Sequence, residues 1–227
     1  MGVNLNDYYA LIGSLPHLPR FDQATRLPIT QERLSERLKM LEPGDAYILS
    51  RIESFLFWKR QVVRESEKEL GRQFNSLMEL PMPDELKEFI RTVMTQRVVM
   101  VQLRRRQRGL PPPVPGAAWG FGHLLRHIEK YWAEPDFKLA YPFIPRAREL
   151  LAAGDAPELD KHGGLYGMRL VDTLVFEKEY TFIGVVGYVF RWNMVAYWLS
   201  FDREMAQKRF EELVAEVCSE FEKRSEQ

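Results

Sequence analysis

Residues 182–199 constrain the fold more than any other part of this chain. The stretch is 18 residues long, reads FIGVVGYVFRWNMVAYWL, and needs an apolar environment on nearly all sides. Its length is close to that of a membrane span, but Arg191 and Asn193 lie near its middle, where a charge is costly in lipid. We therefore predict a buried central helix in which Gly184 and Gly187 permit close contact with neighbouring helices.

The charge of Arg191 must be balanced if this helix is buried, because an isolated charge is expensive to remove from water. The carboxylates that precede the apolar stretch are the natural candidates. We expect Arg191 to pair with Asp172, Glu177 or Glu179, or to face a partner protein.

Elsewhere in the chain, apolar residues recur at helical spacing, and prolines and glycines divide them into segments. The sequence contains no sustained alternation with period two and no Asn-Gly or Asp-Gly hairpin turn. The predicted fold class is all-α and multi-helical, with little or no β-structure. Beside the helix over 182–199, the patterns predict helices over residues 30–40, 45–71, 84–108, 119–133, 136–140, 145–153, 155–161, 168–179 and 202–223.

Several residues are expected to start or end these helices. The side chains that suit an N-cap, where they accept a hydrogen bond from a free backbone N–H, belong to Thr30, Asp45 and Asp84. Gly71 and Gly109 suit the position after a helix C-terminus. The Gly163-Gly164 pair predicts a flexible joint between two helices.

Residues 110–116 read LPPPVPG and favour a stiff, extended polyproline II connector. This is the strongest internal boundary in the chain. It predicts an N-terminal helical lobe over residues 1–110 and a C-terminal lobe over residues 111–227, with one compact unit as the alternative.

The composition is that of a globular protein, with 45% hydrophobic and 28% charged residues. Lys plus Arg number 32 and Asp plus Glu number 32, so the chain lacks the dominant basic field that nucleic-acid binding requires. The single cysteine, Cys218, cannot form an internal disulfide, and the N-terminus does not resemble a signal peptide. We therefore expect a cytoplasmic protein that does not bind nucleic acid.

The densest basic run lies at the end of the helix predicted over 84–108 and comprises Arg104, Arg105, Arg106 and Arg108. A solvated helix end explains it without any ligand, because the helix dipole favours cations there. The functional alternatives are an acidic protein partner, anionic lipid headgroups or RNA. We place the acidic partner first among these, because no aromatic residues interrupt the run.

His123 and His127 have the i, i+4 spacing that places two imidazoles on one helix face, as zinc sites do. Leu124 stands where zinc proteases carry glutamate, and a third ligand is suggested only by residue type, at Glu129, Asp136 or His162. Ordinary roles on a helix surface are therefore the main expectation for this pair. The chain also contains no phosphate-binding loop and no nucleophile elbow, so we predict no catalytic residue and no cofactor.

Four segments of the chain occur together in a distinctive combination. They are YYALIGSLPHLP at residues 8–19, the Leu41-Glu-Pro-Gly-Asp45 turn followed by an I-x-x-F-L-x-W helix, the Glu134-Pro-Asp-Phe137 turn, and FEKEYTFIGVVGYVFRWNMVAYWLSFD at residues 176–202. The combination resembles an uncharacterised bacterial family encoded inside V-type ATPase gene clusters. In those clusters the family occupies the place otherwise expected for the funnel subunit, the all-helical, funnel-shaped protein that sits on the membrane rotor ring and receives the central shaft. The C-terminal segment of this chain also resembles a repeat unit of the funnel subunit.

The resemblance implies helical lobes like those of the funnel subunit. It implies a non-catalytic component that couples shaft to ring or assists assembly, peripheral to the inner face of the membrane through protein contacts. The basic run and Arg191 are then the expected partner-binding residues. The alternatives are a free-standing cytoplasmic helical adaptor and a metal protein that uses His123 and His127.

Overall fold

The computed structural model describes residues 8–57, 67–112, 125–131 and 142–201, and these residues form helices and connecting turns without a strand. The predicted all-α fold is confirmed. The predicted helices over 136–140 and 202–223, the Glu134–Phe137 turn, His123, Asp136 and Cys218 lie outside the described residues. The elements are α1 (Tyr9–Gly13), the 3-10 helix η1 (Phe21–Gln23), α2 (Gln31–Leu38), α3 (Pro43–Leu56), α4 (Glu67–Met78), α5 (Asp84–Gln107), α6 (Leu125–Lys130), α7 (Ile144–Ala153), α8 (Ala156–Val175) and a helix over 182–201.

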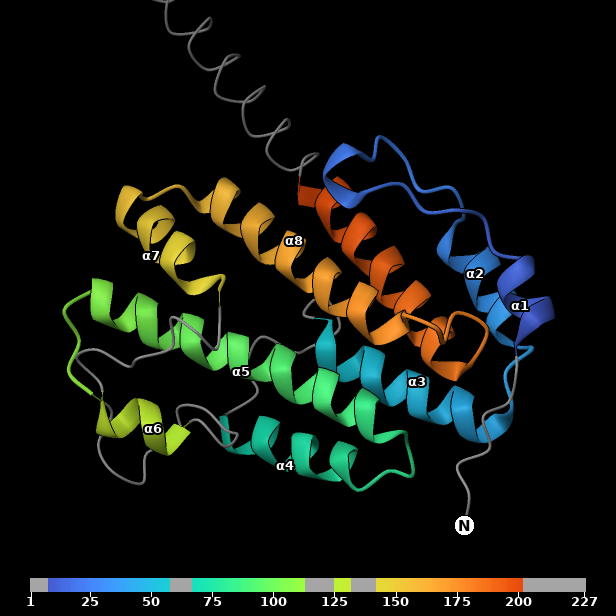
Figure 1. Ribbon diagram of the computed structural model, residues 1–227, viewed down its shortest axis with the longest axis horizontal. Coiled ribbons are helices and arrows are strands. Elements are labelled where there is room, and N and C mark those ends of the chain that lie inside the picture. The colour runs from blue at the N-terminus through green and yellow to red at the C-terminus, as the bar shows by residue number, and fades with distance from the viewer. Residues whose placement is uncertain (1–7, 58–66, 113–124, 132–141, 202–227) are drawn as a thin grey trace, which may run out of the picture.

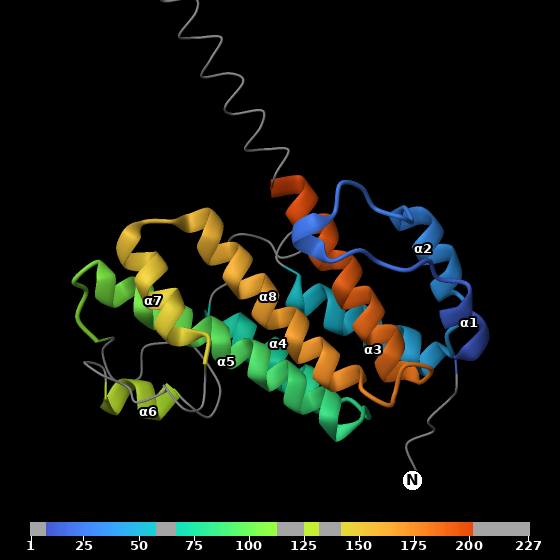
Figure 2. The same cartoon turned by 45° about the horizontal axis from the view of Figure 1, so that its top comes forward.

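Helix α5 runs along the length of the molecule and organises the other elements (Figure 1). Helices α6, α7 and α8 pack on α5, and α3 packs on α4. Figures 1 and 2 agree that α6 and α7 lie near the C-terminal end of α5, whereas α1, α2 and α3 lie toward the other end of the molecule. Among the described residues, no helix combines the length and hydrophobicity needed to cross a membrane.

Two main clusters of buried side chains form the interior, and both α5 and α8 contribute to each. The larger cluster contains Met94 of α5 and Val171 of α8, together with residues of α1, α3, α4 and the helix over 182–201. The smaller cluster contains Val98 of α5 and Leu159 of α8, together with residues of α6 and α7. The predicted lobe boundary at residue 110 therefore falls at the end of α5 and not between the clusters, each of which combines residues from both sides of it.

The helix over 182–201 is the most deeply packed element, as its apolar sequence predicts. Its buried residues include Phe182, Ile183, Val185, Val186, Val189, Phe190, Trp192 and Val195. A β-carbon added at Gly187 would lie 2.2 Å from Cγ2 of Val175, and one at Gly184 would lie 1.9 Å from the carbonyl oxygen of Glu179. Both glycines therefore allow the close approach that was predicted for them.

The N-terminal segment is held against this central helix by hydrogen bonds at three points. The Tyr188 hydroxyl donates to the carbonyl of Pro16 (2.9 Å), and the Trp192 indole N–H donates to the carbonyl of Ile29 (2.9 Å). The backbone N–H of Tyr8 donates to the carbonyl of Tyr180 (2.5 Å). An irregular, proline-rich segment thus gains a fixed path through side chains near the other end of the chain.

Two of the expected helix ends are confirmed. The Thr30 side chain accepts from the backbone N–H of Arg33 (3.4 Å) at the start of α2. Gly109 has φ 66°, and the backbone N–H of Leu110 donates to the carbonyl of Arg105 (3.0 Å) across it. This is the glycine-terminated C-cap that the sequence predicts for α5.

The start of α3 and the end of the predicted 45–71 helix are corrections. Helix α3 begins at Pro43, a residue suited to the first helical turn, and Asp45 instead accepts from the Tyr8 hydroxyl (2.5 Å). Phe57 is extended, so α3 ends at Leu56, and Gly71 lies inside the separate helix α4. The start of α5 is wrong by one residue, because Pro83 is the N-cap and Asp84 the first helical residue.

The predicted flexible joint at Gly163-Gly164 is wrong. Both glycines lie inside α8, which is continuous where helices over 155–161 and 168–179 were predicted. A β-carbon at Gly164 would lie 2.6 Å from Cζ of Phe21. The glycine therefore serves close packing of η1 on α8 and not bending.

Candidate functional site

The basic run forms the C-terminal end of α5. Arg104, Arg105 and Arg106 occupy its last turn and Arg108 is its C-cap. Arg104 and Arg108 are exposed, whereas Arg105 and Arg106 are half-buried. Over the described parts of the chain, no carboxylate forms a direct ion pair with any of the four. The helix dipole places partial negative charge at this end, so four cations are stabilised here and stay available to an acidic surface.

This end of α5 is fixed to its neighbours. The side-chain amide of Gln107 donates to the carbonyl of Leu151 on α7. Val98, Val99 and Leu103 anchor the same part of α5 in the smaller buried cluster. The arginines are therefore presented by a rigid helix end and not by a loop.

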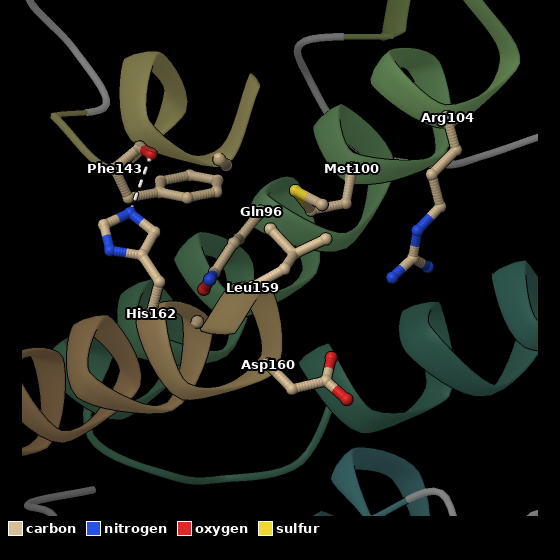
Figure 3. A pocket seen from close by; sticks show the side chains of 9 residues that line it. Gln96, Met100, Arg104, Phe143, Leu159, Asp160 and His162 are labelled. Carbon is tan, nitrogen blue, oxygen red and sulfur yellow. Dashed lines mark hydrogen bonds between the residues drawn. The ribbon is translucent and has the colours of Figure 1, made fainter. Parts of the chain in front are cut away.

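A cavity of about 110 Å³ opens beside Arg104, between α5, α7 and α8 (Figure 3). Its apolar lining comprises Met100, Phe143, Ala147 and Leu159. Its polar lining comprises Gln96, Arg104, Asp160 and His162. Three of these side chains, from Gln96, Met100 and Arg104, follow one face of α5 at intervals of one helical turn.

Asp160 carries the negative charge at this cavity. Burial raises the pKa of its carboxyl group, while the positive charge of Arg104 and a hydrogen bond with the Tyr197 side chain oppose the rise. Tyr197 belongs to the helix over 182–201, so interactions of Asp160 connect α8 with two other helices. Asp160 was not identified from the sequence, because its neighbours Arg104 and Tyr197 are both distant from it along the chain.

His162 lies at the other side of the cavity from Asp160 (Figure 3). Its Nε2 atom is 2.9 Å from the carbonyl oxygen of Phe143, and a carbonyl can only accept, so Nε2 carries the proton. In the neutral imidazole this leaves Nδ1 as an acceptor. The ring is thereby oriented as part of the α7–α8 contact.

Arg191 is not part of the basic end of α5. Its Nη2 atom lies 2.8 Å from Oδ1 of Asp172, one of the three carboxylates predicted for it. Asp172 and Asp160 are twelve residues apart on α8, which corresponds to about 18 Å along the helix axis. The structure thus separates Arg191 from the basic run and pairs it within the chain.

The proposed histidine pair is described only in part. His127 lies in α6 with its ring centroid 4.8 Å from that of Tyr131, whereas His123 is outside the described residues. His162 lies on α8, where it bonds to Phe143. Within the described ranges, no three His, Cys, Asp or Glu side chains are grouped so that they could hold a metal ion.

A second surface, which the sequence did not reveal, lies where α1 meets the turn before the central helix. The rings of Tyr9 and Tyr180 stack with centroids 4.8 Å apart, yet the two residues are 60% and 48% exposed. Phe176, which caps α8, is 69% exposed. The sequence does not distinguish the buried Tyr8 from the exposed Tyr9, because the distinction depends on how α1 docks.

Comparisons with protein-family models, with curated proteins and with solved structures found no match to this chain.

Proposed function

We propose that this chain is a non-catalytic component of a bacterial V-type ATPase, which couples the central shaft to the membrane rotor ring or assists its assembly. In this role it is cytoplasmic, peripheral at the inner face of the membrane, and held there by protein contacts. The observation that carries the proposal is that the described segments behind the resemblance, although far apart in sequence, form one connected unit.

Tyr8 joins these segments. Its hydroxyl donates to Asp45 (2.5 Å) and accepts from the backbone N–H of Glu42 (3.3 Å), which connects the first segment to the Leu41–Asp45 turn. Its backbone N–H donates to Tyr180 in the last segment (2.5 Å). Residues that make such mutual contacts explain why the segments occur as a combination, and this supports a shared fold with the family.

Two exposed surfaces then suit the role of a coupler. The basic end of α5 presents Arg104, Arg105, Arg106 and Arg108. The aromatic end presents Tyr9, Phe176 and Tyr180. The turn that carries Tyr180 is joined to the start of α5 by an ion pair between Lys178 and Glu85 (2.8 Å).

The two surfaces lie at opposite ends of α5, a separation of about 30 Å for a continuous helix of this length. Because α5 also contributes to both buried clusters, the surfaces are connected by a packed body. Such an arrangement suits transmission of force between two partners, one of them acidic. Aromatic side chains at the other end are the residue type that most often anchors protein interfaces.

The test is charge reversal at the basic end, with the ATPase encoded beside this chain as the readout. Changing Arg104, Arg105, Arg106 and Arg108 to Glu should prevent stable incorporation into that complex. The matched control changes Arg26, Arg33, Arg37 and Lys39 to Glu, which alters net charge equally at exposed positions around α2. A further variant retains the half-buried Arg105 and reverses the other three, so that loss of folding is distinguished from loss of binding.

The proposal predicts that both basic-end variants fail to incorporate while the control incorporates normally. Normal assembly and coupling of the quadruple basic-end variant would refute the assignment of this surface. A chain whose gene lies apart from any ATPase genes would count against the function as a whole.

A further inference from the structure

We propose that the cavity between α5, α7 and α8 binds a small zwitterion, a molecule with one carboxylate and one ammonium group, such as glycine or alanine. The proposal is independent of the ATPase function and concerns a site that the sequence did not indicate. It rests on the placement of Arg104 and Asp160 around a space of small and defined volume (Figure 3).

Arg104 and Asp160 approach the cavity from different helices. The guanidinium group comes from α5 and the carboxylate from α8, with open space between them in Figure 3. The two charges are close enough for Arg104 to favour the ionised form of Asp160, but they form no direct ion pair. Each therefore has hydrogen-bonding capacity directed at a ligand of opposite charge.

The carboxylate of Asp160 is positioned for this role. The Tyr197 side chain hydrogen-bonds to it, and an ionised carboxylate has about four acceptor positions, so it can also accept from an ammonium group. Partial burial makes its charge costly, and an ammonium group beside it would offset that cost. Arg104 offers up to two parallel N–H donors to the carboxylate of the same ligand.

The volume limits the size of the ligand. A cavity of about 150 Å³ holds a benzene molecule, and each water of the bulk liquid occupies about 30 Å³. The volume of about 110 Å³ therefore admits a molecule somewhat smaller than benzene. Glycine and alanine have this size, and Met100, Ala147 and Leu159 provide an apolar lining for a methylene or methyl group.

A ligand with only one charge fits this site less well. Acetate can pair with Arg104, but it places a second negative charge near Asp160. Methylammonium can pair with Asp160, but it adds a positive charge near Arg104. The site should therefore distinguish a zwitterion from both of its halves, which a general anion-binding surface would not do.

The experiment is a titration of the full-length protein, followed by NMR through the backbone amide of Gly163, which lines the cavity. Glycine and alanine should shift this signal saturably. Acetate and methylammonium should bind at least about ten-fold more weakly, which corresponds to about 1.4 kcal/mol. Arg104→Gln and Asp160→Asn should each weaken glycine binding by a similar factor, whereas Arg108→Gln, at the same helix end but outside the cavity lining, should leave it unchanged.

Arg104 is exposed, so Arg104→Gln should fold even if Asp160→Asn does not, and it then carries the test alone. Equal binding of acetate and glycine would overturn the proposal in favour of a simple anion site. Absence of any saturable shift with glycine or alanine would also overturn it, because the cavity would then hold water only.

Discussion

The ring of Phe21 lies directly against the backbone of Gly164, so that a β-carbon at residue 164 would be 2.6 Å from the ring atom Cζ. Phe21 is only 1% exposed, and its ring meets that of Trp198 edge-on with centroids 5.3 Å apart. The ring is thus enclosed and has little room to move away. This contact fixes η1 between α8 and the helix over 182–201.

Gly164→Ala should therefore destabilise the protein by about 1–3 kcal/mol, the usual cost of overfilling a packed interior. Gly163→Ala is the matched control on the same helix, because the nearest atom to its β-carbon, Nε2 of Gln96, would be 4.0 Å away. That change should be neutral or stabilise by up to about 1 kcal/mol through helix propensity. Urea unfolding of both variants tests the contact, and equal effects of the two changes would contradict it.

Gly187 makes the corresponding contact between the central helix and α8. Gly187→Ala should cost at least about 1–3 kcal/mol, because its β-carbon would lie 2.2 Å from Cγ2 of Val175. The double variant with Val175→Ala should recover part of this loss, since it removes the clashing methyl group. Gly167→Ala, whose β-carbon would be 3.8 Å from Phe190, serves as the control. Strictly additive losses in the double variant would show that the two residues do not meet.

The ion pair between Arg191 and Asp172 should contribute little to stability. Asp172 has a side chain that is 64% exposed, and pairs of this kind are worth about 0.2–1 kcal/mol. A double-mutant cycle with Arg191→Met and Asp172→Asn should give a coupling energy in that range that decreases as salt is added. A coupling above about 2 kcal/mol that is insensitive to salt would mean that the pair is shielded from solvent.

Tyr188 should make stability sensitive to alkaline pH. Burial raises the pKa of its phenol to about 12, above the ordinary value of about 10. The folded state therefore favours the neutral phenol, and this contribution is complete below about pH 10 and lost as pH rises through about 12.

Tyr188→Phe should lower stability at about pH 8 by about 0.5–1.5 kcal/mol, because it removes the hydrogen bond to Pro16. The difference between the variant and the original protein should shrink by about pH 11, since the phenol of the unfolded state then ionises. Urea unfolding at both pH values measures the two differences. A difference that is the same at both would contradict the role of the buried phenol.

The features that the sequence predicted correctly are those decided by nearby residues. Thr30 caps α2 and Gly109 ends α5, because both depend only on the backbone within one helical turn. The apolar spacing of α5 likewise predicted its buried residues, including Leu86, Phe89, Ile90, Met94, Val98 and Leu103. The position of the basic run at the end of α5 followed from the same pattern.

The features that were predicted wrongly depend on residues that are distant in sequence. Asp45 was assigned to an N-cap, but the Tyr8 hydroxyl occupies its carboxylate. Gly164 was assigned to a flexible joint, but its missing side chain admits Phe21. In each case the residue type was recognised as special, while the reason lay in a partner that local patterns do not contain.

The candidate sites show the same division. The four arginines of the basic end were named from the sequence, and Asp172 was among the three partners expected for Arg191. The approach of Arg104 to Asp160 was not predictable, because it depends on the register with which α8 packs on α5. The exposed stack of Tyr9 on Tyr180 depends in the same way on the docking of α1.

The most direct test of the proposed function is to purify this chain, tagged in its source organism, from gently solubilised membranes. Quantitative mass spectrometry then measures which proteins accompany it and in what ratio. The proposal predicts shaft and rotor-ring proteins of a V-type ATPase in fixed ratio to this chain, retained when salt is raised. Recovery of the chain alone or with unrelated proteins, while the intact ATPase is purified without it, would contradict the proposal and favour a free-standing adaptor.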